Sequence, residues 1–477
     1  MSDTEPNGAT GRAQAEQATG ASSAAPVWQS PRPGMVTDLY ELTMAAAFHA
    51  AGIEHEASFE LSVRRLPAER RFLVAAGLDA ALAGLEDFGY DAGELGYLDS
   101  LGLFPPRFLE LLDGLRFTGD VWAVPEGEVV FAGEPLVRVT APLVEGQLVE
   151  TFLLNQIASH TLVASKAARV ALASGDRSFI DFSTRRDHGI GAAMATARSA
   201  WIAGAGGTSL VAAGQRWGIP VSGTMAHSFV MAFDDEREAF RVYARAFPQA
   251  AILLLDTYDT VRGAHHAVAV ADELRAEGIR IAGVRLDSGD LAQLSIEVRR
   301  ILDDAGFGDV RIVASGDLDE HRIAELLADG ATIDAFGVGT QLGTAADAPS
   351  LGAVYKLVED VHGPKMKLAE GKITLPGRKQ VWRQAQGDVL GLHDEDVDGR
   401  PLLVPVMVDG RRLPAGSEDL AVVRERCRAA LAGLPPVLRS LDPVADPETS
   451  VWPVQLGAGL RALAADVRAE LIQAEAS

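Results

Sequence analysis

Cysteine is almost absent from this chain of 477 residues, in which Cys427 is the only one. A single thiol cannot form an intramolecular disulfide, and it cannot supply the several thiolates of a cysteine metal cage. The composition therefore fits a reducing compartment, and we expect the protein to be cytoplasmic.

Basic residues are scarce relative to acidic ones, with 43 Lys and Arg against 66 Asp and Glu and a formal net charge of -23. This excess of negative charge disfavours general attraction to nucleic acid or to an anionic membrane, so we expect neither partner. An anionic small molecule would need a local cluster of Arg or Lys.

Long apolar runs are also missing. No stretch of about eighteen apolar residues predicts a membrane span, and the N-terminus lacks the basic-then-apolar order of a signal peptide. Residues 1–30 are mostly Ala, Ser, Gly, Glu and Gln, and we interpret them as a disordered tail. The remaining length and the 48% hydrophobic content predict two or three packed units.

The hydrophobic pattern changes along the chain. A helix is predicted from Thr37 or Asp38 onward, residues 117–149 form short alternating runs typical of a β-rich unit, and residues 151–172 have a helical period. Short apolar strands then alternate with helices, which implies a parallel sheet covered by helices. The candidate strands are residues 178–182, 219–222, 251–255, 281–284, 310–314 and 333–336. The Arg-rich stretch 424–428 is interpreted as a solvated helix face.

Polar clusters follow these strands. Because the carboxyl ends of parallel strands share one face, we expect the clusters to meet in one site. Capping of the following helices alone would favour Gly, Asp, Ser and Thr here, but it does not explain Arg185 beside Arg186, Arg285 or His227. The clusters are residues 185–186, 223–228, 256–259, 285–290, 315–317 and 337–340.

Two of the clusters predict a phosphate site. Glycines at 315–317 and 337–340 let backbone N–H groups approach an anion at a helix N-terminus, although either loop alone can be a simple tight turn. Four carboxylates on neighbouring strand ends suit ribose hydroxyls or a hydrated Mg²⁺, although each alone can be a helix cap; they are Asp256, Asp259, Asp287 and Asp290. His227 can be a general base, a phosphate acceptor or a structural histidine.

Taken together, these motifs resemble the nicotinate phosphoribosyltransferase family. They occur in the family's order between about residues 35 and 385. The matching segments are Thr-Asp-Leu-Tyr-Glu-Leu-Thr-Met at 37–44, Phe-Ser-Thr-Arg-Arg at 182–186, Gly-Thr-Met-Ala-His-Ser at 223–228, Asp-Thr-Tyr at 256–258, Arg-Leu-Asp-Ser-Gly-Asp-Leu at 285–291 and Lys-Gln-Val-Trp-Arg at 379–383.

The resemblance implies a type II phosphoribosyltransferase fold, an irregular parallel α/β barrel joined to a mixed α+β domain built partly from both chain ends. We therefore expect an N-terminal α+β domain at 31–148, the barrel at 149–355 and a C-terminal segment at 356–477 that packs on the N-terminal domain. It also implies a homodimer that joins nicotinate to 5-phosphoribosyl 1-diphosphate in NAD salvage. ATP as co-substrate and Mg²⁺ carried by the diphosphate are implied as well.

The resemblance also implies residue roles. His227 matches the phosphorylated histidine, Phe182 the aromatic that stacks on the pyridine ring, and Tyr40 the tyrosine that covers the ring's other face from the partner subunit. Arg185 and Arg285 match basic residues around nicotinate and the phosphoribosyl group. The remaining matches are Asp287 at the ribose, Ser209 and Asp256 at the substrate, and Gly316, Asp317, Gly337, Gly339 and Thr340 at the phosphate.

The sequence departs from the family pattern in two places. Asp187 and His188 stand where an Ala-Gln pair is usual, and residues 204–210 lack an Asp and an Asn that many members carry. The related nicotinamide phosphoribosyltransferase is an alternative, but its pattern has an Asp in the position of Ser209 and a Gly in that of Arg186. A non-catalytic, ligand-binding paralogue is a further alternative, disfavoured by the intact His227.

Overall fold

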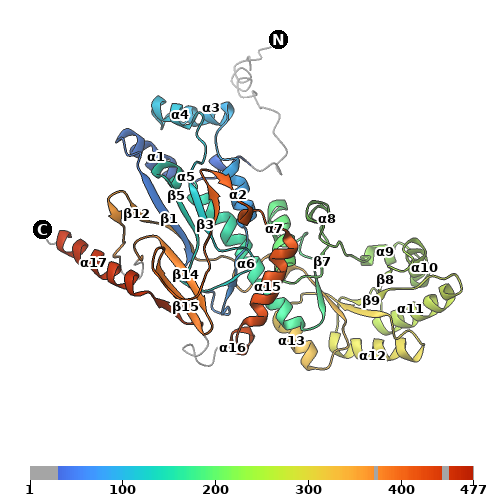
Figure 1. Cartoon of the computed structure of the whole chain (residues 1–477). Helices are drawn as coiled ribbons and strands as arrows, with labels where there is room; N and C mark the ends of the chain where they lie inside the picture. Colours follow the sequence, from blue (N-terminus) through green and yellow to red (C-terminus); the bar gives the residue numbers. More distant parts are fainter. Residues whose placement is uncertain (1–30, 370–373, 443–450, 476–477) are drawn as a thin grey trace, which may run out of the picture. The chain divides into compact units, whose positions relative to one another are not determined.

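The computed structural model describes residues 31–369, 374–442 and 451–475. The tail predicted for residues 1–30 lies outside the described residues. Within the described ranges, the strands form sheets of seven, six, four and two strands (Figure 1). No helix in this part of the chain has the length and apolar character that crossing a bilayer requires.

The seven-stranded sheet combines strands from the N-terminal region with strands that follow residue 350. Its order is β13-β12-β1-β5-β3-β17-β18, and β1 pairs antiparallel with both β5 and β12. The sheet therefore depends on both ends of the chain. Its strands are β1 (Glu56–Val63), β3 (Asp120–Ala123), β5 (Pro135–Pro142), β12 (Ala353–Asp360), β13 (Gly363–Pro364), β17 (Val404–Val408) and β18 (Arg411–Arg412).

Short helices accompany this sheet and share one hydrophobic core with it. The predicted first helix begins at Leu39, directly after the N-cap residue Asp38. The β-rich prediction for 117–149 is confirmed by β3, β4 and β5, although its last residues form a helix. The elements are η1 (Pro33–Met35), α1 (Leu39–Ala50), α2 (Leu78–Glu86), α3 (Ala92–Ser100), α4 (Pro106–Leu112) and α5 (Leu143–Leu148), with the two-stranded sheet β2 (Leu73–Val74) and β4 (Val129–Val130).

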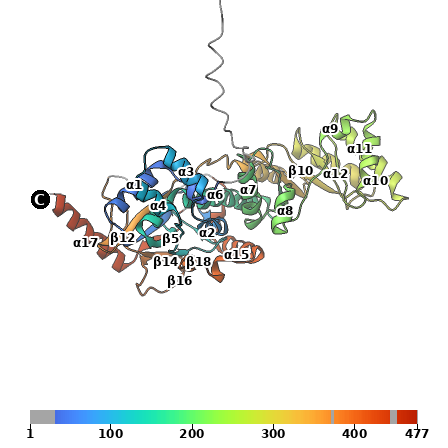
Figure 2. The same ribbon diagram turned by 90° about the horizontal axis from the view of Figure 1, so that it is seen from above.

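Helix α6 (Glu150–Ser174) lies between this sheet and the parallel one (Figures 1 and 2). It confirms the helix predicted for 151–172. Residues 160–170 are all buried, because α6 packs against α2, β2, α7 (Ile190–Ile202) and α13 (Glu320–Ala328). A helix that is covered on every side is a core element rather than an amphipathic surface helix.

The six-stranded sheet is parallel, in the order β7-β6-β11-β10-β9-β8. Helices pack in succession around it, from α10 through α11, α12 and α13 to α6 and α7. The strands are β6 (Ser178–Asp181), β7 (Gly207–Thr208), β8 (Ile252–Leu254), β9 (Gly283–Leu286), β10 (Arg311–Ala314) and β11 (Ala335–Val338). The helices are α7 (Ile190–Ile202), α8 (Val211–Trp217), α9 (His227–Met231), α10 (Glu236–Ala246), α11 (Thr260–Arg275), α12 (Leu291–Asp304), α13 (Glu320–Ala328) and α14 (Thr340–Gly343).

The predicted parallel α/β arrangement is confirmed, but a closed barrel is not. The strand predicted at 219–222 makes only one bridge, between Thr208 and Val221, and β8 pairs with β9 alone among the described strands. The chain between Val221 and β8 forms α9 and α10 instead of a strand that would close the ring. The described sheet is therefore open.

The described part of the C-terminal region adds a four-stranded sheet, three α-helices and one 3-10 helix. Its elements are β14 (Lys379–Gln384), β15 (Gly387–Leu392), β16 (Arg400–Pro401), β19 (Val454–Leu456), η2 (Pro414–Gly416), α15 (Leu420–Gly433), α16 (Pro436–Arg439) and α17 (Ala458–Glu475). The interpretation of 424–428 as a solvated face is wrong for part of the stretch. Arg424 lies 3.9 Å over the Trp201 ring and donates to Ala205 O at 2.8 Å, while Cys427 is buried. Helix α15 packs against α7 and not only against water.

Candidate active site

His227 is the first residue of α9, and two loops from other strands reach its ring. Nδ1 lies 3.2 Å from Thr257 Oγ1, and Nε2 lies 3.8 Å from Asp287 Oδ2. The His227 side chain is 40% exposed, so a nucleotide can reach it from solvent. The loops after β8 and β9 therefore meet the segment at 223–228, as the sequence predicted.

Asp287 and Asp256 are linked to each other through the backbone. Asp256 Oδ2 accepts from Asp287 N at 3.0 Å and from Ser288 Oγ at 2.6 Å. Asp256 Oδ1 is buried and has no partner among the described residues. Ser315 Oγ donates to Asp287 Oδ1 at 2.5 Å, which adds the loop after β10 to the cluster.

Arg285 is the cation of this cluster. Its Nη1 donates to Thr224 Oγ1 at 2.7 Å, and its Nε is buried without a partner in the described part of the chain. Burial lowers the pKa of Arg285, and nearby Asp287 opposes that shift. A guanidinium in this setting keeps its charge and has unused donors, which suits an anionic ligand.

Phe182 connects the loop after β6 with the glycine-rich loop after β11. Its N–H donates to Val338 O at 2.8 Å. A Cβ at Gly337 would stand 2.5 Å from the Phe182 ring, so only glycine lets the two loops approach this closely. Gly339 and Thr340, at the start of α14, come directly after Val338, so the loop at 337–340 and the loop that begins at Phe182 are neighbours, as the sequence predicted.

Position 316 also requires glycine, because the backbone there has a positive φ and lies close to another loop. The φ of Gly316 is +95°, and a Cβ would stand 2.0 Å from the carbonyl oxygen of Asp287. Asp317 follows with a φ of +49°, a conformation that Asp tolerates better than most residues. The loop at 315–317 therefore lies directly against the loop that carries Asp287.

Ser209 joins the site through a residue that sequence reasoning missed. Its N–H donates to Asp181 O at 2.8 Å. Asp181 is fully buried at the end of β6, and its Oδ2 accepts from Thr208 Oγ1 at 2.8 Å. Burial raises the pKa of Asp181. The one sequence signal that could have identified Asp181 is its position as a charged residue at the end of an apolar strand.

Three of the predicted residues do not enter the cluster. Asp259 Oδ1 accepts from Arg262 N at 2.8 Å and Asp290 Oδ1 from Gln293 N at 3.2 Å, so both cap helices. Tyr40 lies in α1, which packs on α4 and α5, beyond α6 from β8 and β9 (Figures 1 and 2). Burial and nearby Glu150 raise its pKa. Among the described residues, no hydrogen bond or ring contact joins Tyr40 to Phe182.

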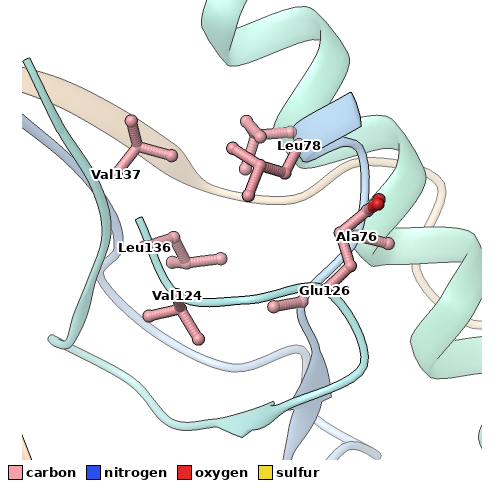
Figure 3. Close-up of a pocket in the computed structure, with 8 residues that line it drawn as sticks. Ala76, Leu78, Val124, Glu126, Leu136 and Val137 are labelled. Atoms are coloured by element: carbon pink, nitrogen blue, oxygen red, sulfur yellow. The ribbon is translucent and has the colours of Figure 1, made fainter. Parts of the chain in front are cut away.

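Two hollows lie elsewhere in the molecule. One of about 10 Å³ is lined by Ala76, Leu78, Val124, Leu136 and other residues around Glu126 (Figure 3), which leaves room for about one water molecule. Another of about 280 Å³ has basic residues in its lining, among them Arg64, Arg65, Lys356 and Lys379. Neither shares a residue with the strand-end cluster.

Comparison with known proteins assigns the family. The model of the nicotinate phosphoribosyltransferase N-terminal domain matches residues 35–158, and the model of the nicotinate phosphoribosyltransferase family matches residues 177–372. The chain belongs to the nicotinate phosphoribosyltransferase family. Relatives in the family agree along most of the chain. Nicotinate phosphoribosyltransferase pncB2 of Mycobacterium tuberculosis is 50% identical over 413 residues, 86% of this chain and 89% of the relative.

Two further family members extend this likeness. The Bacillus subtilis nicotinate phosphoribosyltransferase is 48% identical, covering 77% of this chain and 78% of its own length. The crystal structure of human nicotinic acid phosphoribosyltransferase matches with a TM-score of 0.80 at 32% identity, over 90% of this chain and 99% of that one. The fold described above is therefore the fold of the family.

Proposed function

We propose that this chain is a nicotinate phosphoribosyltransferase that makes nicotinate mononucleotide and diphosphate from nicotinate and 5-phosphoribosyl 1-diphosphate. The reaction belongs to the cytoplasmic salvage of NAD. Hydrolysis of ATP to ADP and phosphate is coupled to it, which makes the enzyme an ATP-coupled ligase. One observation carries the proposal: in a member of this family, His227, Asp287 and Arg285 lie within one linked cluster at the strand ends.

The acceptor binds between charge and an aromatic ring. The carboxylate of nicotinate pairs with Arg185 and Arg285, because a guanidinium donates two parallel hydrogen bonds to a carboxylate. The pyridine ring stacks on Phe182, whose ring is fixed against Gly337. Ser209 leaves this charge balance intact, whereas an Asp at that position would repel the acid.

The phosphoribosyl donor binds along the glycine loops. Backbone N–H groups around Gly316, Gly337 and Gly339, together with Asp317 and Thr340, hold its 5-phosphate. Departure of the diphosphate builds positive charge on the anomeric carbon, and the Asp287 carboxylate is the group that we assign to stabilising that charge. Fixing the pyridine nitrogen behind the same carbon makes the step nearly unimolecular.

Mg²⁺ accompanies the diphosphate in this proposal. The described residues contain no group of three or more His, Cys, Asp or Glu that could hold a metal by themselves. Mg²⁺ commonly takes one or two carboxylates and completes its shell with phosphate and water, and the unpartnered Oδ1 of Asp256 suits that arrangement. The ion would supply neutralisation of the diphosphate charge.

His227 is the site of ATP coupling. Thr257 engages Nδ1, so Nε2 is the nitrogen that attacks the γ-phosphorus of ATP, forming an N–P bond and releasing ADP. Water later cleaves that bond and releases phosphate. While present, the phosphoryl group adds negative charge beside the site, which orders the donor loops through their N–H groups.

Acceptor choice tests the function. Purified protein is given 5-phosphoribosyl 1-diphosphate and Mg²⁺ with nicotinate, nicotinamide or quinolinate, with and without ATP, and mononucleotide formation is followed by chromatography. Of the three acceptors, we expect only nicotinate to give a mononucleotide. Its formation should be faster when ATP is present. Preferential use of nicotinamide would point to the related amide-specific activity, and no product from any acceptor would point to a non-catalytic binder.

A further inference from the structure

A chain of three side chains lies beneath the loop that carries Phe182 and Arg185. Ser183 Oγ is 2.6 Å from Asp181 Oδ1 and 2.9 Å from Asp187 Oδ2. Asp181 and Ser183 are fully buried. The hydroxyl of Ser183 therefore bridges two carboxyl groups.

The Ser183 hydroxyl does not have enough hydrogens to donate to two ionised carboxylates. A hydroxyl carries one hydrogen, so it can donate to only one of the two oxygens. If both acids were ionised, the other contact would bring two electron-rich oxygens together with no hydrogen between them. One proton on a carboxyl group resolves this conflict.

The other hydrogen bonds decide which acid carries the proton. Asp181 accepts from Ser183 N at 2.9 Å and from Thr208 Oγ1 at 2.8 Å, in addition to the Ser183 hydroxyl, so its ionised form is well solvated. Among the described residues, Asp187 has one further donor, Thr196 Oγ1, at 3.0 Å from its Oδ1. The proton therefore belongs on Asp187 Oδ2, which donates to Ser183 Oγ, and Ser183 then donates to Asp181.

Charged neighbours do not remove the need for that proton. In the described part of the chain, neither acid takes part in an ion pair, and the charges that bear on Asp187 are those of Asp181 and His188. Arg198, on α7, is already paired with Glu126 at 2.6 Å. Strand β7 and helix α14 carry no charged residue. Burial raises the pKa of both Asp181 and Asp187, which favours a proton on the pair, and the hydrogen bonds assign it to Asp187.

The hydrogen-bonded series Asp181–Ser183–Asp187 contacts three loops of the site. Asp181 holds Ser209 N through its carbonyl oxygen, and Ser183 follows Phe182 directly. A Cβ at Gly343 would stand 2.1 Å from Asp187 Oδ1, so Asp187 also lies against α14 behind Thr340. A shift of the Asp187 carboxyl group would therefore displace the loops that carry Phe182, Ser209 and Thr340.

We propose that Asp187 is a positioning residue that stays a neutral acid, donates through Ser183 to Asp181, and thereby fixes the loop that binds nicotinate. This rests on the proposed function. Asp187 touches no substrate itself. As pH rises and the acid ionises, the Ser183 bridge fails, the loop loosens and nicotinate binding weakens, while the chemical step changes less.

Kinetics of the Asp187→Asn variant test the proposal, because the amide donates to Ser183 at every pH. As pH is raised over the range in which the protein stays folded, the wild-type KM for nicotinate should rise about fivefold relative to that of the variant, the effect of one hydrogen bond. The KM of Asp187→Ala, which lacks the donor, should be high throughout. Asp176→Asn, at an exposed position, is the matched control and should follow the wild type. Equal pH profiles for wild type and Asp187→Asn would overturn the proposal.

Thermal unfolding of the same proteins without substrate gives a readout that is independent of activity. A carboxyl group with a higher pKa in the folded state makes the fold less stable as pH rises from its unfolded to its folded pKa. The wild-type Tm should therefore fall relative to that of Asp187→Asn over this range. A pH-dependent Tm difference in a protein that makes no mononucleotide would refute the proposed function and leave the neutral acid standing. Active enzyme with a constant Tm difference would refute the neutral acid alone.

Discussion

His227 has a different neighbour at each ring nitrogen, Thr257 at Nδ1 and Asp287 near Nε2. The hydroxyl fixes the ring, and the carboxylate faces the nitrogen that we assign to phosphoryl transfer. Asp287 lies beside His227 and in the same segment as Arg285, so this segment connects the nitrogen assigned to ATP coupling with the residues assigned to the substrates.

The His227→Ala variant should lose ATP stimulation and keep a weak transfer of the phosphoribosyl group, because only the phosphoryl acceptor is removed. Incubation with γ-labelled ATP should leave no acid-labile label on this variant. His265→Ala, at an exposed histidine of α11, is the control and should label like wild type. Stimulation by ATP that survives in His227→Ala would count against the assignment.

Arg285→Ala should raise the KM for nicotinate by about tenfold or more, since a hydrogen-bonded charge pair contributes about 1.5–3 kcal/mol. Initial rates over a range of nicotinate concentrations measure this. Arg300→Ala, whose side chain is 67% exposed in α12, should leave the KM unchanged. An unaltered KM in Arg285→Ala would remove Arg285 from the acceptor pocket.

The sequence predicted which polar residues lie close together where they follow parallel strands, and it failed where a contact depends on tertiary structure. Asp287 and Arg285 could be grouped because β8, β9 and β10 are parallel, whereas His227 follows the run at 219–222, which makes one parallel bridge. The bridge from Asp181 through Ser183 to Asp187 could not be predicted, because its distances depend on how one loop folds back on itself. For Asp259 and Asp290 the sequence suggested site residues, but in the structure both side chains cap helices, which was the alternative.

At the level of elements, the positions of most strands were predicted to within a few residues. Which strands form the edge of the parallel sheet was not predicted. The apolar run at 219–222 lacks a full partner and makes one bridge, whereas the two-residue strand β7 had no pattern to reveal it. Whether a short run becomes a strand depends on what lies beside it. The same limit applies to α15, where Arg424 is held by the Trp201 ring and by carbonyl groups.

A buried ion network ties α6 to the segments that follow β10 and β11 in the parallel sheet. Lys166 Nζ lies 2.6 Å from Glu320 Oε2 and 3.1 Å from Asp347 Oδ1. Asp347 also pairs with Arg70 at 2.8 Å, from the loop before β2. The network therefore joins α6, α13 and the segment after α14 to the N-terminal region.

Lys166→Met should destabilise the protein by about 3 kcal/mol, because it leaves buried carboxylates without a full complement of partners. Urea unfolding followed by circular dichroism measures the change. Arg300→Met removes an exposed pair with Asp304 and should cost under about 0.5 kcal/mol. Equal unfolding midpoints for the two variants would show that the network contributes no more than a surface pair.

At the scale of the whole molecule, the position of Tyr40 beyond α6 bears on assembly. We propose that a homodimer brings the tyrosine of one subunit to the Phe182 pocket of the other, as the family resemblance implies. Tyr40 is 48% exposed on α1, a helix that packs on α4 and α5, so its side chain is available to a partner subunit.

Mixing two impaired variants tests this assembly. Tyr40→Ala and Arg285→Ala proteins, each with low activity alone, should recover about a quarter of the wild-type activity after subunit exchange, because half of the dimers are mixed and each has one intact site. Sedimentation should report a dimer throughout. Activity that stays at the mean of the two variants would place Tyr40 and Arg285 in the same subunit's site, or in none.

The convergence of separate loops on one molecule is most directly tested by a crystal structure with nicotinate mononucleotide bound. We expect the pyridine ring on Phe182, its carboxylate at Arg285 and the phosphate at Gly337 and Gly339. A nucleotide bound elsewhere, with His227 and Arg285 facing different surfaces, would contradict it.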